Sequence, residues 1–221
     1  MSPQMLSLLA DATVQTLLMV VVAGVLATLA GVPLGLFLAL SGAGDLLPRP
    51  GLQRAIGLIV NATRSTPFII LVVAIVPLTR LLTGTSIGTA AATVPLTLAA
   101  IPFIARVVES AVREVDHGLL DAARAMGAGP GQIVTKILLP EARAGIVRGL
   151  TLAAVNLVGY SAMVGAVGGG GLGDLGIRYG YQRFMPEMML AVVLILIIVV
   201  QALQSGGEAL ARRLDKRNPG N

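Results

Sequence analysis

Hydrophobic residues dominate this chain in five long stretches that carry no charged side chain. They cover residues 12–44, 65–79, 81–105, 149–173 and 188–207, and polar segments that hold all the charge lie between them. A helix of about 20 apolar residues crosses the hydrocarbon core of a bilayer, and four of the five stretches reach that length. The pattern predicts an all-α integral membrane protein.

The same pattern predicts five transmembrane helices in a single domain that covers residues 1–221. The stretch 65–79 is long enough only if its helix begins near Ile56, with Arg64 snorkelling to the interface or facing protein. The first stretch has no basic segment before it and is longer than the apolar part of a signal peptide, so it is interpreted as a retained helix. The predicted spans are about 14–41, 56–80, 87–111, 145–167 and 187–207.

Composition supports a membrane location and excludes several kinds of site. Hydrophobic residues make up 55% of the chain and charged residues 12%, and the mean hydropathy is +0.86, which a soluble domain does not show. Cysteine is absent, so disulfides and cysteine metal sites are excluded. The only histidine, His117, is interpreted as a solvated loop residue and not as a metal ligand.

The distribution of basic residues predicts the orientation in the membrane. Only Arg80, Arg178 and Arg183 fall on one side of the predicted helices, whereas thirteen of the 16 basic residues fall on the other. Because basic residues concentrate in cytoplasmic loops, the N-terminus is predicted outside and the C-terminus inside. The thirteen cytoplasmic residues are Arg49, Arg54, Arg64, Arg106, Arg113, Arg124, Lys136, Arg143, Arg148, Arg212, Arg213, Lys216 and Arg217. This bias also explains the isoelectric point near 10.4, so no nucleic-acid partner is expected.

A charged segment, residues 118–140, lies in the longest predicted cytoplasmic loop. A first short helix is predicted after a cap at Asp116 or His117, with one apolar face. Gly127 is predicted to end it in the left-handed conformation that glycine readily adopts. A second short helix is expected from Gln132 to Leu139, stopped by Pro140. The residues alone leave open whether this pair of helices caps its own bundle or docks into a partner.

The spacing within this segment resembles the EAA motif of ABC-transporter permeases. That motif is Glu-Ala-Ala, three residues, Gly, nine residues and then Ile-x-Leu-Pro. This chain has Asp121-Ala122-Ala123, Gly127 and Ile137-Leu138-Leu139-Pro140 with both gaps preserved and Asp in place of Glu. The resemblance implies that residues 118–140 form the coupling segment that sits in a cleft of an ATPase subunit. The residues assigned to that contact are Asp121, Ala122, Ala123, Arg124, Met126, Gly127, Ile137, Leu139 and Pro140.

Further segments look like the methionine-uptake permeases within this group. They are Asn61–Phe68, Thr85–Gly88, Val94–Leu96, Ile101–Phe103, Gly159–Met163, Gly165–Asp174 and Arg178–Phe184. The resemblance implies a permease of the type I ABC importer fold that moves methionine, L- and possibly D-, across the bacterial inner membrane by alternating access. It implies a homodimer with two ATPase subunits and an extracytoplasmic methionine-binding protein. No enzymatic activity and no cofactor are expected on this chain, with ATP and Mg on the partner.

Polar residues inside the predicted helices are candidates for the translocation path, because such residues face protein or water and not lipid. Met163 adds an adaptable side chain, Pro67 a candidate bend, and the glycines after the fourth helix a candidate external gate. The residues assigned to the path and gate are Asn61, Ser65, Pro67, Tyr160, Ser161, Met163, Gly168 and Gly169. Hydrogen bonding between helices is an equally weighted interpretation of Tyr160 and Ser161. The run Gly168–Gly171 has no following Gly-Lys-Ser/Thr, so it predicts close helix approach or a hinge and not a phosphate loop.

Three other classes compete with this interpretation. A secondary transporter would need an acidic relay within the membrane, and the uncharged stretches hold no Asp or Glu. Nothing in the chain resembles a channel selectivity filter, and a purely structural protein would not need the spaced cytoplasmic motif. The closest alternative is a permease for another amino acid or a small peptide.

Overall fold

The computed structural model describes residues 3–215, and this range contains helices and no strand. Four helices are long and apolar enough to cross a membrane, and a fifth span results if the bent pair α2 (Pro50–Ser65) and α3 (Phe68–Ala74) is counted as one. The all-helical architecture predicted from the hydrophobic pattern is confirmed. The four long helices are α1 (Pro3–Leu40), α5 (Thr89–Arg113), Pro130–Gly169 with α8 (Leu139–Val164) as its main part, and α10 (Pro186–Leu214).

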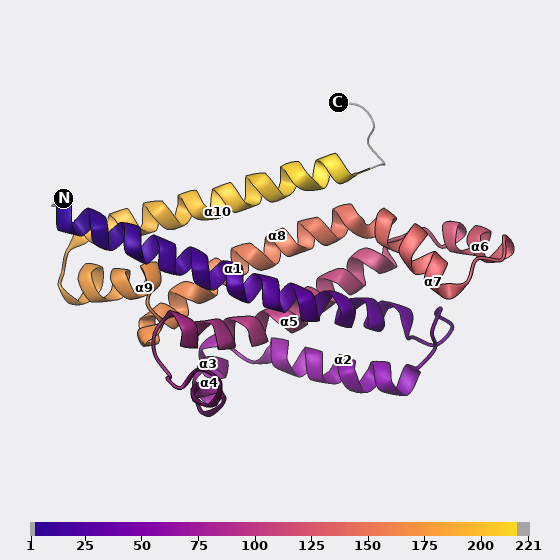
Figure 1. Cartoon of the computed structure of the whole chain (residues 1–221), viewed down its shortest axis with the longest axis horizontal. Coiled ribbons are helices and arrows are strands. Elements are labelled where there is room, and N and C mark those ends of the chain that lie inside the picture. The colour runs from indigo at the N-terminus through magenta and orange to yellow at the C-terminus, as the bar shows by residue number, and fades with distance from the viewer. Residues whose placement is uncertain (1–2, 216–221) are drawn as a thin grey trace.

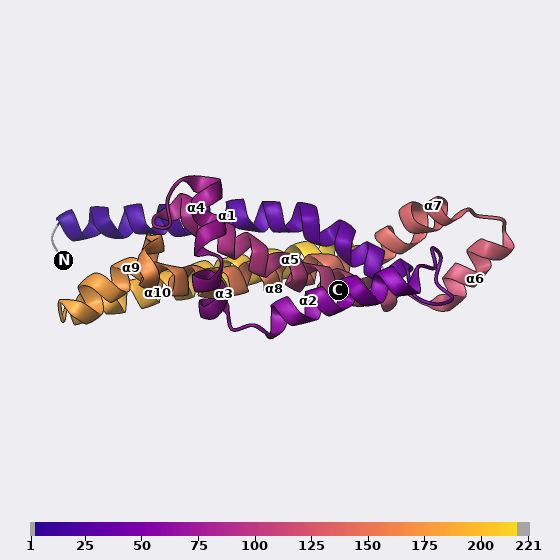
Figure 2. The ribbon, with the colours of Figure 1, turned by 90° about the horizontal axis from the view of Figure 1, so that it is seen from below.

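The long helices run along the length of the molecule and pack side by side. α1 lies along α5, and α8 packs between α5 and α10. The short helices α6 (His117–Ala125) and α7 (Pro130–Ile133) project beyond the bundle at one end (Figures 1 and 2). The first described residues and α9 (Gly171–Leu175) lie at the other end. The predicted coupling segment and the predicted glycine gate therefore lie at opposite ends of the molecule.

Small residues bring α1 and α5 into close contact. Ala23 and Ala27 of α1 are fully buried in the main core, and a Cβ added at Gly35 would lie 2.4 Å from the carbonyl oxygen of Ala105. Apolar packing against lipid offers no hydrophobic driving force between helices, so close backbone approach supplies the attraction through van der Waals contact. The α1–α5 pair is therefore stabilised by van der Waals contact between closely approaching backbones.

Replacing Gly35 by alanine is expected to destabilise the bundle by about 2 kcal/mol, because the new methyl group forces the two backbones apart. A lower midpoint of thermal unfolding in detergent would show this. Gly24→Ala on the same helix is the matched control, since a Cβ there meets only Leu157 Cδ1 at 3.6 Å. Equal midpoints for the two variants would contradict the prediction.

The predicted continuous helix 56–80 is wrong: the structure breaks it at Ser65–Pro67, where α2 and α3 meet at 104°. Thr66 is extended, with φ −81° and ψ 127°, as expected for a residue before proline. The Oγ–H of Ser65 donates to the carbonyl of Asn61 at 2.9 Å, and the hydroxyl of Thr66 donates to Ala62 at 3.1 Å. These hydroxyls occupy the last carbonyls of α2, so the helix ends where Pro67 provides no N–H.

A second break at Ile75 separates α3 from α4 (Val76–Thr83), which Gly84 ends in the left-handed conformation, with φ 74°. In Figure 1, α4 is seen nearly end-on beside α3, so it crosses the direction of the long helices. The predicted second span is therefore divided into α2, α3 and α4. Only α2 runs along the bundle.

The other spans extend beyond their predicted limits. α1 begins at Pro3 and not near residue 14, and α10 continues to Leu214 and not to about 207. α5, predicted over 87–111, covers Thr89–Arg113. The predicted limits followed the uncharged stretches, but a helix continues into water where its backbone hydrogen bonds and neighbouring helices still support it.

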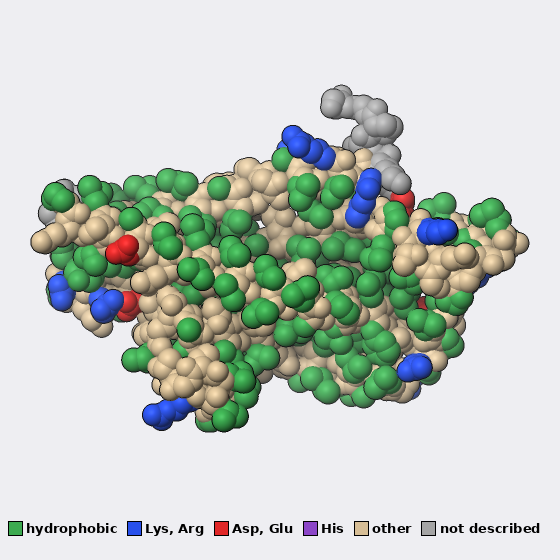
Figure 3. All heavy atoms as spheres, viewed as in Figure 1, with side chains coloured by type: hydrophobic (Ala, Val, Ile, Leu, Met, Phe, Trp, Pro, Cys, Tyr) green, Lys and Arg blue, Asp and Glu red, His purple; other side chains and the backbone are tan. Residues whose placement is uncertain are grey.

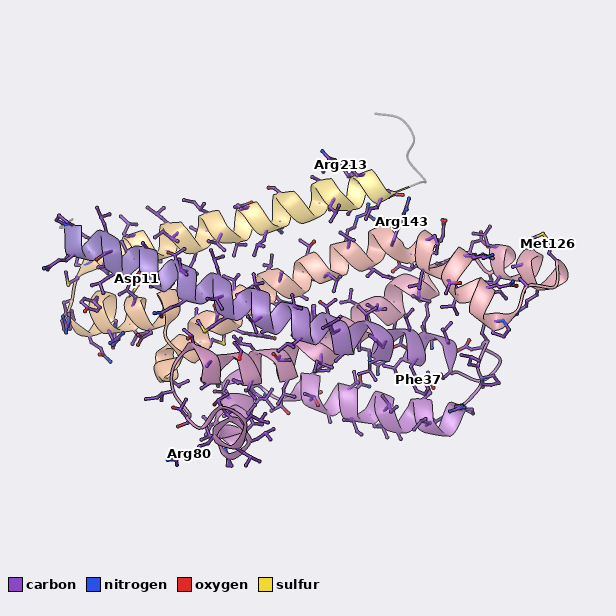
Figure 4. The ribbon with its side chains drawn as sticks, viewed as in Figure 1. Asp11, Phe37, Arg80, Met126, Arg143 and Arg213 are labelled. Atoms are coloured by element: carbon purple, nitrogen blue, oxygen red, sulfur yellow. The ribbon has the colours of Figure 1, made fainter. Side chains whose placement is uncertain are left out.

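Charged side chains gather towards the ends of the molecule. The face in Figure 3 shows a central band without Lys, Arg, Asp or Glu, flanked by charge on both sides. Arg143 and Arg213 lie towards the α6–α7 end, and Asp11 lies at the opposite end (Figure 4). Arg80 lies on α4, at the edge of the molecule (Figure 4). Lys216 and Arg217, which were assigned to the cytoplasmic tail, lie outside the described residues. The distribution fits a bundle with an apolar middle and polar ends.

Candidate functional site

The projecting segment 118–140 is built from local capping signals. Asp116 Oδ1 accepts a hydrogen bond from the Gly118 N–H at 2.7 Å and starts α6. After α6, Gly127 adopts φ 80°, and its N–H donates to the Arg124 carbonyl at 2.9 Å. Pro130 then opens α7. The two predicted signals, an Asp116 cap and a left-handed Gly127, are both present in the structure.

The segment has one face on the bundle and one face in solvent. Ala123, Ile133 and Leu138 are buried in the main core, whereas Met126 is 80% exposed and Leu119 is 45% exposed. Met126 lies at the tip of the molecule (Figure 4). The arrangement supplies both a cap for the bundle and a free apolar rim.

The residues predicted for coupling divide between these faces. Asp121 and Arg124 form an exposed ion pair at 3.4 Å, which adds little stability in water. The exposed members are Asp121, Ala122, Arg124, Met126 and Gly127, the buried one is Ala123, and the half-buried ones are Ile137, Leu139 and Pro140. The exposed set is therefore concentrated in α6 and the turn that follows it.

The prediction that the second short helix stops at Pro140 is wrong. α7 continues through a π-helical turn, η1 (Val134–Leu138), directly into α8, and the range Pro130–Gly169 forms one long helix. Proline provides no N–H and crowds the preceding turn. The wider π turn just before Pro140 accommodates this, with the Leu139 N–H donating to Val134. The part of the segment from Pro130 onwards is thus continuous with a bundle helix, and α6 joins it through the turn at Gly127.

A cavity of about 340 Å³ separates α6 from the ends of α1 and α5. Polar residues on its wall include Asp45, Arg113, His117 and Arg124, and Leu138 and Val115 add apolar surface. α6 is therefore not in full contact with the ends of α1 and α5 on this side. Space of this kind leaves room for α6 to shift relative to the bundle.

The polar residues of the predicted path lie on two elements that meet at an aromatic stack. The rings of Phe68 in α3 and Tyr160 in α8 are 4.3 Å apart at 13°. Met163, one turn further along α8, is 49% exposed. Asn61, Ser65 and Pro67 are exposed on α2 and the following break. The structure thus brings the break at Pro67 next to Tyr160 through Phe68.

Ser161 does not belong to this exposed surface. It is 1% exposed, and its hydroxyl donates to the Val158 carbonyl at 2.7 Å. A hydroxyl that is satisfied within its own helix has no need of solvent or a partner helix. Ser161 is therefore buried within the single chain, and its assignment to the path stays a prediction.

The glycine run after α8 makes a tight reversal at the other end of the molecule. Gly168, Gly170 and Gly171 have φ of 91°, 81° and 74°, and the Gly88 N–H donates to the Gly168 carbonyl at 2.8 Å. Backbone N–H groups of the reversal also meet α1: Gly171 donates to Gln15 Oε1 and Leu172 to Thr16 Oγ1, each at 2.9 Å. The run is a hydrogen-bonded reversal of the chain between α8 and α9, and its predicted role as a hinge stays a prediction.

Gly168 and Gly169, both predicted at the gate, differ in position. Gly168 is exposed and lines a cavity of about 450 Å³ with Gln15, Thr89 and Asp174. Gly169 is buried, and a Cβ there would lie 2.4 Å from Val164 Cγ1. Gly168 therefore faces the open end, whereas Gly169 allows close packing.

A buried charge network at the end of α5 was missed by sequence reasoning. Arg106 Nη1 lies 2.6 Å from Glu109 Oε2, and Arg113 Nε lies 3.2 Å from the other oxygen. Glu109 is 8% exposed. Arg106 and Glu109 fall within the predicted span 87–111, and α5 continues beyond that span to Arg113. The i, i+3 and i, i+4 spacing of opposite charges was the available signal.

A second charge cluster joins α8 to the end of α10. Arg148 pairs with Asp215 at 3.0 Å and approaches Glu208 at 3.9 Å. Arg143 Nε donates to the Leu214 carbonyl at 3.0 Å. These contacts hold the last turn of α10 beside the root of the projecting segment. Sequence spacing could not reveal them, because the hydrogen-bonded partners lie 71 and 67 residues apart.

The described residues provide no evident metal centre. No group of three or more His, Asp or Glu side chains between residues 3 and 215 is placed to hold a metal ion. Acidic residues outside the charge networks are scattered over the ends of the helices. The candidate site is therefore made of helix surfaces, hinges and a projecting segment.

Comparison with known proteins places the chain in a transport family. The model of the family "Binding-protein-dependent transport system inner membrane component" matches residues 31–218. A Vibrio cholerae protein described as a probable D-methionine transport system permease, MetI, is 53% identical over 210 residues, covering 95% of this chain and 93% of that protein. The Pasteurella multocida protein of the same description is 44% identical, covering 98% of this chain and all of the relative.

Solved structures agree with the sequence matches. A chain of the MetNI methionine ABC transporter in an inward-facing conformation has a TM-score of 0.95 and 46% identity, covering 98% of this chain and all of that chain. An amino acid ABC transporter with histidines has a TM-score of 0.74 at 20% identity, covering 94% of each chain, and shows the shared fold alone. The expected permease fold is thus confirmed. The chain belongs to the family of binding-protein-dependent transport system inner membrane components.

Proposed function

We propose that this chain is the transmembrane permease subunit of an ATP-driven methionine importer in the bacterial inner membrane. Relatives that match it over nearly its whole length are described as D-methionine permeases. The observation that carries the proposal is the projecting segment 118–140, with its exposed rim at Met126 and the continuation of its second half, from Pro130, into α8. Such a segment suits a transporter in which movement of another subunit is transmitted to the transmembrane helices.

The proposed topology has five spans, with the N-terminus outside and the C-terminus inside. The bent pair α2–α3 is counted as one span, the second along the chain. The last span, α10, returns the chain to the cytoplasmic side. Support comes from the side on which Arg143 and Arg213 lie with the α6–α7 segment, since basic residues favour the cytoplasm. The whole chain, residues 1–221, is proposed as one domain.

The proposed assembly is a homodimer with two ATPase subunits inside and a methionine-binding protein outside. α8 leaves a face exposed in the single chain, marked by Leu152, Gly159 and Met163 at helical spacing. The second copy is proposed to cover part of this face, and the translocation path is proposed to run between the copies. Tyr160, Met163, Asn61, Ser65 and the Pro67 break would border it.

The proposed mechanism is alternating access. ATP and Mg bind to the partner and not to this chain, and closure of the ATPases moves the projecting segment. Because the segment continues into α8, its displacement is transmitted along that helix towards the Gly168–Gly171 hinge. Met126 and Leu119 would supply docking affinity, while Asp121 and Arg124 would fix the register. The subunit catalyses no hydrolysis itself.

Reconstituted complex is expected to accumulate labelled methionine in vesicles only when ATP is present on the ATPase side and the binding protein is on the other side. Competition by unlabelled L- and D-methionine, other amino acids and small peptides would identify the substrate class. Equal uptake without ATP but with an ion gradient would contradict the proposal in favour of a secondary transporter. Stronger competition by another amino acid would replace methionine as the substrate.

A further inference from the structure

The amphipathic helix α2 is attached to the bundle by little apolar surface. Val60 is its only buried residue in the described structure. It joins Leu38 of α1 and Ala105 of α5 in a small cluster, to which Ile56 adds partly buried contact. The rest of α2 faces outward, as Figures 1 and 2 show at the lower edge of the bundle. Apolar packing alone leaves this helix weakly held.

Arg106 supplies two polar contacts between α5 and α2. Its Nη2 donates to the Asn61 side-chain oxygen at 2.8 Å and to the Gly57 carbonyl at 3.2 Å. Among the described residues, no other side chain of α5 donates a hydrogen bond to α2. In the other direction, the guanidinium carbon of Arg64 in α2 lies 6.0 Å from the ring centroid of Phe103 in α5, near the outer limit for a cation–π contact. The guanidinium is thus the main polar connection between the two helices.

The guanidinium is itself held by a network that reaches α1. One carboxylate oxygen of Glu109 lies 2.6 Å from Arg106 Nη1, and the other lies 3.2 Å from Arg113 Nε. Arg113 Nη2 donates to the Leu38 carbonyl at 3.2 Å. Arg113 is the last residue of α5, and Asp116, the cap of α6, follows three positions later. The network therefore joins α2 to the root of the projecting segment.

We propose that Arg106 is a positioning residue that holds α2, and the polar side chains at its end, in register with α5 and the projecting segment. The bond to Asn61 acts as a latch. When it is made, it fixes Asn61 and Ser65 beside the Pro67 break. When it is broken, α2 stays attached through Val60 and Ile56 and through the weaker polar contacts at Gln53 and Gly57. Arg106 is proposed to act through Asn61 and not by contact with the transported solute.

The local structure suits a latch better than a permanent support. Arg106 Nε is buried without a hydrogen-bond partner, so the network is not fully satisfied in this conformation. The Ser65–Pro67 break also separates α2 from α3, which allows α2 to move without displacing the Phe68–Tyr160 stack. A helix with a hinge at one end and one charged contact along its length can shift as a unit.

Hydrogen–deuterium exchange of the full complex in detergent tests the latch directly. Asn61→Leu removes the acceptor and leaves the Arg106–Glu109 pair intact. Exchange in peptides from α2 is expected to accelerate roughly tenfold, because a hydrogen bond to a charged group is lost, while peptides from α8 remain unchanged. Asn61→Asp keeps an acceptor and adds a negative charge, so exchange is expected to stay at or below the wild-type rate.

Arg54→Gln is the matched control for Arg106→Gln. Arg54 lies exposed on α2 and makes no ion pair or hydrogen bond within residues 3–215. Arg106→Gln should accelerate exchange in α2, and Arg54→Gln should not. Unchanged exchange in Asn61→Leu, or equal acceleration in both arginine variants, would overturn the proposal. Faster amide exchange that is confined to α2 in Asn61→Leu and absent in Asn61→Asp would support it.

A coupling measurement extends the test and rests on the proposed function. Arg106→Lys keeps the charge but loses the planar fork that contacts Glu109 and the two acceptors on α2 together. The number of solute molecules moved per ATP is expected to fall severalfold while ATP hydrolysis persists. An unchanged ratio would overturn the role in coupling. The exchange experiment needs no methionine and no transport, so its result stands even if the substrate proves to be another solute.

Discussion

Gly127→Val is expected to abolish ATP-driven uptake while the protein still inserts and folds. Gly127 has φ 80°, and a β-branched residue there pays about 2 kcal/mol for the left-handed conformation. No atom lies within 4 Å of a Cβ built at this position, so the obstacle is backbone conformation and not space. A penalty of that size lowers the population of the native turn by about 30-fold. Uptake and stimulation of the partner ATPase should fall together.

The chain offers a closely matched control two residues away. Gly129 also has no atom within 4 Å of an added Cβ. Its φ of −72° and ψ of 160° lie in the β region, which is allowed for valine. Gly129→Val should therefore retain most uptake. If Gly127→Val keeps both uptake and ATPase stimulation, residues 118–140 do not couple the two subunits.

Gly173→Ala is expected to disrupt the reversal at the opposite end, at a cost of about 3 kcal/mol. An added Cβ at Gly173 would lie 2.3 Å from the Ala162 carbonyl oxygen and 2.5 Å from its Cα. Both contacts are with the backbone of α8, so no side-chain rotation relieves them. The hairpin formed by α8 and α9 would open. A lower midpoint of thermal unfolding and new protease cleavage between residues 165 and 175 would show this.

Gly176→Ala, three residues further along, serves as its control. A Cβ there meets Val192 Cγ1 at 3.4 Å, close to ordinary contact. The variant should unfold near the wild-type midpoint and resist the protease. Similar losses in both variants would mean that the region responds to any added methyl group, and the close approach of Gly173 to Ala162 would not explain its glycine.

Local signals in the projecting segment could be recognised from the sequence because each acts over a few residues. A carboxylate at Asp116 satisfies an N–H two positions away, and Gly127 supplies the positive φ that ends α6. The error at Pro140 came from the same local rule. Proline usually ends a helix, but a π turn before it and the packing of Leu138 in the core carry the helix through.

The site at the α2–α5 contact could not be predicted in the same way. Asn61 and Arg106 are 45 positions apart, and no periodic pattern connects them. The predicted helix 56–80 also concealed the break that separates Asn61 from Phe68. Hydropathy averages over such a segment, whereas the break depends on single hydroxyl and proline groups.

The amino-acid sequence was enough to identify the four long apolar spans, the uneven distribution of basic residues, the turn at Gly127 and the family resemblance. Each follows from composition or from spacing within one helix or turn, where the physical interaction is short in sequence. Only the tertiary structure decided which polar residues meet: Ser161 is satisfied within its helix, Tyr160 stacks on Phe68, and Glu109 is buried between two arginines. These contacts depend on how helices distant in sequence pack, and that packing is set by backbone approach at small residues.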